Sequence, residues 1–166
     1  VADVEEEYNI DGTYYLYNPS TGLFLSAGND WGTQAILDET GVDFNITATA
    51  GGYTLNSRIS NGGDDEYLNS ILYLDQPAET WTISSAGSID GKDTYTLTTD
   101  GSNYLAAPAS GKIIEMTTNR NDEKARWIFL TRDDLLEQMA NATYASPSNA
   151  TFLLPGYNFS RNDLRN

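Results

Sequence analysis

The sequence of 166 residues predicts an all-β fold in which a four-stranded unit occurs three times, followed by a short helix and an extended tail. Three observations lead to this prediction. The chain is rich in tyrosine and glycine (11 and 14 residues), which favours strands joined by tight turns. The same landmarks recur in the same order between residues 13 and 130. The apolar runs are short, and none approaches the ~20 residues of a membrane-spanning helix.

Each unit opens with a strand that carries a leucine, and these leucines are separated by 39 and 42 residues. An aromatic–leucine pair follows, then a short apolar strand (35–37, 72–74 and 113–116), then a closing aromatic strand. Three such units predict a β-trefoil, with six strands in a short barrel and six in hairpins that cap one end. A generic antiparallel sandwich is the alternative fold. In a trefoil the repeated positions meet in one core, formed by Leu16, Leu55, Leu97, Leu25, Leu68, Leu105, Phe44, Trp81 and Trp127.

Turn residues separate the first two strands of every unit. They stand at 18–22 (NPSTG), 61–65 (NGGDD) and 100–103 (DGSN), which is the same place in each unit. We expect exposed loops at one end of the barrel.

The sequence divides into an acidic lead (1–10), the trefoil (11–131) and a C-terminal part (132–166). Residues 132–140 read as a short helix that Thr131 caps, with Asp133 and Asp134 suited to its first turn. Residues 150–154 are a strand candidate, and this last part resembles the start of a further module.

Composition excludes much of catalysis. The chain has no cysteine and no histidine, which removes thiol nucleophiles, Ser-His-Asp triads and the usual zinc sites. Its net charge of −15 disfavours nucleic acid and anionic membrane surfaces as partners. Residues 64–66 are acidic but lack the alternating spacing of a calcium loop. We therefore expect no enzyme activity, no metal, no cofactor and no membrane insertion.

Two stretches, YYLYNPSTGLFL (14–25) and NDWGTQA (29–35), resemble ricin-type β-trefoil modules, closest to those attached to secreted glycan-processing proteins of gut Bacteroidetes. The Gln-x-Trp signature of that family is degraded, because Glu79 and Ala125 stand two residues before the tryptophans and Phe44 replaces the first one. The resemblance implies a lectin-like module, a secreted, periplasmic or cell-surface location, and neighbouring domains in a longer polypeptide.

The family places a sugar site in each unit, built from an acidic residue, an aromatic platform and an amide. Matched unit by unit, the resemblance implies the candidates Asn29, Asp30 and Trp31; Asp64, Asp65 and Tyr67; and Asp100, Asn103 and Tyr104. Turn formation is the alternative for the Asp and Asn residues, and core packing for Tyr67 and Tyr104. The predicted function is non-catalytic binding of a neutral glycan. A protein-interaction or spacer domain and a trefoil-type protease inhibitor are the alternatives.

Overall fold

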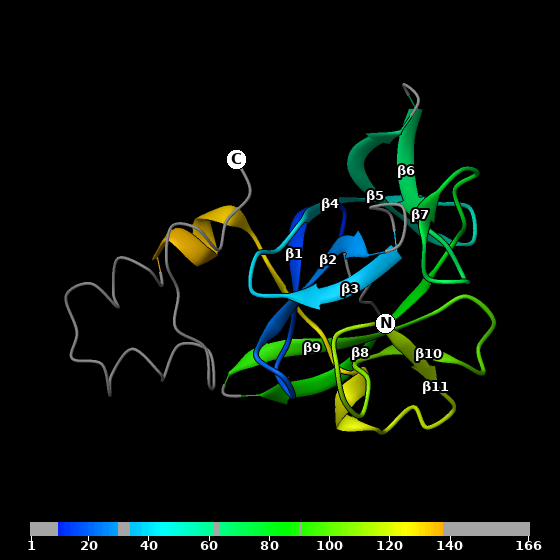
Figure 1. Ribbon diagram of the computed structural model, residues 1–166. Coiled ribbons are helices and arrows are strands. Elements are labelled where there is room, and N and C mark those ends of the chain that lie inside the picture. The colour runs from blue at the N-terminus through cyan, green and yellow to red at the C-terminus, as the bar shows by residue number, and fades with distance from the viewer. Residues whose placement is uncertain (1–9, 30–33, 62–63, 90, 138–166) are drawn as a thin grey trace, which may run out of the picture.

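The computed structural model describes residues 10–29, 34–61, 64–89 and 91–137, and most of its regular structure is β (Figure 1). The first unit contains β1 (Gly12–Asn18), β2 (Leu23–Asn29), β3 (Gln34–Asp38) and β4 (Asp43–Thr49). The second contains β5 (Gly52–Asn61), β6 (Asp64–Leu68), β7 (Leu74–Asp75) and β8 (Thr82–Ile89). The third contains β9 (Lys92–Thr98), β10 (Tyr104–Ala106), β11 (Glu115–Thr117), the 3₁₀ turn η1 (Glu123–Ala125) and β12 (Ile128–Leu130).

Six strands close a barrel because each pairs with the next around a ring. Antiparallel ladders join β1 to β4, β4 to β5, β8 to β9, and β12 to β1. Single bridges complete the ring, with Tyr53 opposite Trp81 and Tyr95 opposite Trp127. Each bridge has two backbone hydrogen bonds, of 2.7–2.8 Å in the first case and 2.9–3.0 Å in the second. The first and last strands of the described chain therefore lie side by side.

The other six strands form three hairpins, β2–β3, β6–β7 and β10–β11. Their outer strands meet, since Gln34 bridges Tyr73 and Ile36 bridges Ile113. The backbone N–H of Leu37 donates to the Lys112 carbonyl at 2.7 Å. A barrel of six strands capped by three hairpins is the β-trefoil that the repeats predict.

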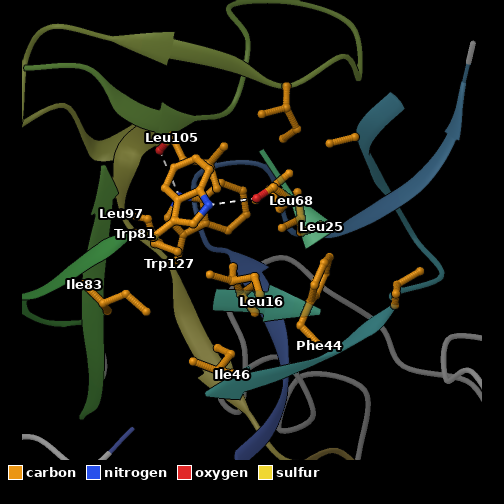
Figure 2. Packing of buried hydrophobic residues seen from close by; sticks show 14 of the residues in the cluster. Leu16, Leu25, Phe44, Ile46, Leu68, Trp81, Ile83, Leu97, Leu105 and Trp127 are labelled. Atoms are coloured by element: carbon orange, nitrogen blue, oxygen red, sulfur yellow. Dashed lines mark hydrogen bonds between the residues drawn. The ribbon is translucent and has the colours of Figure 1, made fainter. Parts of the chain in front are cut away.

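The core confirms the repeat pattern. All nine residues predicted to be buried together are fully buried in one cluster, and Figure 2 labels all of them except Leu55. The indole Nε1 of Trp81 donates to the Leu68 carbonyl at 2.9 Å, and that of Trp127 to the Leu105 carbonyl at 3.0 Å. Phe44 has no such donor in the first unit.

In the first unit, the backbone N–H of Val42 donates to the carbonyl of Leu25, which corresponds to Leu68 and Leu105, at 3.3 Å. Each unit thus supplies a hydrogen-bond donor to the equivalent leucine carbonyl. The donor is an indole N–H in the second and third units and a backbone N–H in the first.

One glycine is required by the close approach of two strands. Gly52 begins β5 with φ +152°, and a Cβ there would lie 2.3 Å from the carbonyl oxygen of Trp81. A backbone atom cannot move aside as a flexible side chain does, so only glycine fits without shifting a barrel joint.

The second unit differs from its prediction at the hairpin between β5 and β6. Its strands pair as far as Asn61 with Asp64, so the turn expected over 61–65 is wrong in its bounds. The register shifts between Asn56 and Ser60, where Arg58 has φ +61°. Beyond this irregularity the two strands pair again, Ser60 with Asp65 and Asn61 with Asp64.

A second apolar cluster covers the outer side of the joint between β1 and β12. It consists of Tyr15, Tyr17, Phe24, Ile128, Leu130 and Leu135. Leu135 belongs to the helix at 132–137. Burial in this cluster raises the pKa of Tyr17 well above its ordinary value.

The short C-terminal helix is confirmed over residues 132–137. The hydroxyl of Thr131 accepts from the Asp134 backbone N–H at 3.0 Å, and the Asp134 carboxylate accepts from the Thr131 N–H at 3.0 Å. This reciprocal pair is a capping box, with Asp in the usual place of Glu. Residues 138–166, including the expected strand at 150–154, lie outside the described part of the chain.

Candidate functional site

The third unit brings its three predicted site residues together on the turn between β9 and β10. One carboxylate oxygen of Asp100 accepts from the backbone N–H groups of Ser102 and Asn103, both at 2.8 Å. The other accepts from the Asn103 side-chain amide at 2.9 Å. The Tyr104 hydroxyl donates to the Gly101 carbonyl at 3.2 Å.

These bonds are typical of an Asx turn. The Asn103 amide first, then the backbone N–H groups of Ser102 and Asn103, lower the pKa of Asp100 to about 2. The polar groups that would fix sugar hydroxyls are thus engaged within the turn, as the structural alternative for Asp100 and Asn103 expects.

In the other two units, the structure describes fewer of the predicted site residues. Tyr67 is half-buried in β6, opposite Asn56 on one side and Asp75 on the other. The backbones of Asp64 and Asp65 lie in β6 and that of Asn29 ends β2, while their side chains are outside the described part. Asp30 and Trp31 lie outside the described residues altogether. Sugar binding by these residues stays a prediction.

The structure contains a pocket of about 220 Å³ that the sequence analysis did not anticipate. It lies where β1, β9, β12 and the helix at 132–137 meet, and we call it the seam pocket because β1 and β12 close the barrel there. Its described lining consists of three aromatic residues (Tyr14, Tyr95 and Phe129), three charged residues (Lys92, Asp93 and Asp134) and three aliphatic residues (Ile10, Ile128 and Leu130).

Phe129 joins the two tyrosines into one aromatic wall. Its ring centroid lies 5.6 Å from that of Tyr14 and 4.9 Å from that of Tyr95, with interplanar angles of 44° and 39°. All three side chains are only half-buried. Such rings offer apolar surface on which the C–H face of a ligand can pack.

Repeat symmetry explains why this wall occurs at this joint. Phe129 stands two residues after Trp127, and the corresponding residues of the other units are Ile46 and Ile83. An aliphatic side chain has no ring face. This departure from the repeat is the signal that could have revealed the pocket from the sequence.

The charged residues of the seam pocket come from two elements. Lys92 and Asp93 begin β9, while Asp134 belongs to the helix, where the Thr131 N–H holds one of its carboxylate oxygens. In the part of the chain that the structure describes, neither Lys92 nor Asp93 forms an ion pair within 4 Å. Their hydrogen-bonding groups can therefore serve a ligand, in contrast to those of Asp100 and Asn103.

The seam pocket places hydrogen-bonding side chains beside aromatic rings. The described residues include no group of three or more acidic side chains placed to hold a metal ion. No helix in the described ranges is long and apolar enough to cross a membrane. Carboxylate acceptors and an ammonium donor beside apolar ring surface are the groups that fix and pack a small polar ring.

No protein-family model matches the chain, and no curated protein matches it in sequence. Solved structures do resemble it. A ricin B-like lectin from Macrolepiota procera, in complex with lactose, has a TM-score of 0.53 and 12% identity, covering 75% of this chain and 99% of the lectin. A salivary protein from Culex quinquefasciatus, of the cysteine- and tryptophan-rich family, has a TM-score of 0.55 and 14% identity, covering 79% and 97%.

The designed threefold-symmetric protein ThreeFoil has a TM-score of 0.52 and 17% identity, covering 73% of this chain and 99% of the design. At such low identity these likenesses establish the β-trefoil fold alone.

Proposed function

We propose that this chain is a non-catalytic carbohydrate-binding domain and that the seam pocket holds the sugar. The observation that carries the proposal is the aromatic wall of Tyr14, Tyr95 and Phe129. It lies beside charged side chains that can form further hydrogen bonds. The likeness to a lectin solved with lactose supports it at the level of the fold.

A sugar ring has two kinds of surface. Its C–H groups pack against aromatic faces, and its hydroxyls both donate and accept hydrogen bonds. The seam pocket offers the carboxylates of Asp93 and Asp134 as acceptors and Lys92 as a donor. A ligand with hydroxyls on one side and an apolar ring face on the other satisfies both.

The pocket is smaller than the roughly 300–1,000 Å³ of drug-sized sites, so little surface is buried on binding. We expect millimolar to high-micromolar affinity for a neutral or weakly charged glycan. The proposed setting is secreted, periplasmic or at a bacterial cell surface, beside other domains of a longer polypeptide.

The test is a glycan array with the full chain, followed by titration of the best ligand. The pseudo-symmetry provides a matched pair of variants. Tyr14→Leu should weaken binding at least fivefold, whereas Tyr53→Leu, at the same position of the second unit and outside the described pocket lining, should leave it unchanged.

Absence of any glycan ligand would refute the proposal and leave the spacer and the protease inhibitor as functions to test. Binding that neither Tyr14→Leu nor Asp93→Asn weakens would place the sugar elsewhere, for example at the candidate residues of the three units.

A further inference from the structure

We infer that the sugar residue accepted by the seam pocket carries a free amino group, as a 2-amino sugar does. This inference rests on the proposed function and adds the class of sugar. It starts from the charges of the described lining, which comprise two carboxylates, Asp93 and Asp134, and one ammonium group, Lys92.

A neutral sugar would leave this pocket with one uncompensated negative charge. Lys92 forms no ion pair within 4 Å of either described carboxylate, but its charge offsets one of the two negative charges of the lining, and a bound ligand would exclude water from part of the carboxylates. A ligand with a single positive charge balances the second carboxylate through charge-assisted hydrogen bonds. Its charge therefore matches the lining, whereas a uronic acid would add a second uncompensated negative charge.

The aromatic wall also favours a ligand with a positive charge. Rings attract cations that lie over their faces, and Tyr14, Tyr95 and Phe129 supply three rings at one place. The net charge of −15 adds a general attraction for cations and a repulsion for acidic sugars.

Asp134 is held in position for this role. Its carboxylate is tied to the Thr131 N–H at 3.0 Å, and the adjoining Leu135 is buried in the second cluster. An acceptor that is fixed before binding loses less conformational freedom when the ligand arrives.

The experiment compares sugars that share a ring and differ at one substituent. Glucosamine, N-acetylglucosamine and glucose, and the same three compounds of the galacto series, are titrated into the full chain and followed by NMR. In at least one series the amino sugar should bind about tenfold more tightly than its two relatives, because a partly exposed ion pair and a cation–π contact each contribute modestly. The gap should shrink in about 1 M salt, where the Debye length is about 3 Å.

Two variants test whether the amino sugar binds in this pocket, because they should shift the preference for the amine in opposite directions. Asp93→Asn should reduce the preference for the amine severalfold, while Lys92→Gln, which leaves both carboxylates uncompensated, should increase it. Glu115→Gln, which removes an exposed strand carboxylate outside the described lining, is the matched control and should change nothing.

Equal affinity for the amino, N-acetyl and hydroxyl sugars would overturn the inference and leave the proposed function intact. A preference that neither Asp93→Asn nor Lys92→Gln alters would overturn it as well. If no sugar of either series binds, and the array finds none, both the inference and the proposed function fail.

Discussion

The indole of Trp127 offers the sharpest test of how the three units stabilise one core. Its side chain is fully buried, and Nε1 donates to the Leu105 carbonyl at 3.0 Å. Trp127→Phe keeps an aromatic ring but removes the donor, and so installs the residue type that the first unit has at Phe44. The first unit, however, supplies a donor from the Val42 backbone, whereas in the third unit the Ala125 N–H bonds to the Asp122 carbonyl.

The expected loss of unfolding free energy has two parts. Phenylalanine lacks the ring nitrogen and two carbon atoms of tryptophan, and losing buried carbon costs about 0.8 kcal/mol for each CH₂-sized group. Removing one partner of a buried hydrogen bond costs about 1–3 kcal/mol more. We therefore expect Trp127→Phe to destabilise the chain by about 3 kcal/mol, or roughly 10 °C in Tm.

The measurement is urea unfolding followed by circular dichroism, with Trp81→Phe as the parallel variant in the second unit. Trp81→Phe should cost a similar amount, since its indole donates to the Leu68 carbonyl at 2.9 Å. A loss below about 1 kcal/mol in both tryptophan variants would refute the reasoning, because it would show that neither the donor nor the ring volume contributes.

The remaining predictions concern a glycine, a turn and the helix. Gly52→Ala should destabilise the chain by several kcal/mol in the same assay, because its Cβ would lie 2.3 Å from the Trp81 carbonyl; a stability equal to wild type would contradict that approach. Asp100 has a pKa lowered to about 2, so the stability it contributes is present above about pH 4 and is lost as the pH falls through about 2. Unfolding titrations between those values should therefore show a weaker pH dependence in Asp100→Ala than in the wild type, and an unchanged slope would argue against the turn network. Leu135→Ala should cost about 2–3 kcal/mol and expose the helix to limited proteolysis while the β-sheet spectrum is retained; equal cleavage rates would show that the helix is not held by its leucine.

The core could be predicted from the sequence because its landmarks repeat. Leu16, Leu55 and Leu97 open equivalent strands, and Phe44, Trp81 and Trp127 close equivalent units; all six are fully buried in one cluster. A barrel with threefold pseudo-symmetry must bring equivalent positions together, so local order along the chain was enough to predict their contact. The capped helix after Thr131 was predictable for the same reason, because its signals lie within a few residues.

The role of the candidate binding residues could not be predicted from local sequence patterns. Asp100, Asn103 and Tyr104 are the right residue types for a sugar site, and the same types also build a turn. The hydrogen bonds show that the Asp100 carboxylate is engaged by its own loop, and sugar binding by these residues stays a prediction.

What only the tertiary structure decided is the seam pocket. Tyr14, Lys92 and Phe129 lie far apart in the sequence and meet because β12 pairs with β1 and Tyr95 of β9 bridges Trp127, just before β12; Asp134 joins them from the helix that follows β12. The sequence by itself determined the order of the strands but not all of their bounds, the core, and the absence of cysteine and histidine. It could not determine which charged and aromatic side chains share a cavity, because that depends on how the ring of strands closes and on where the helix packs after closure.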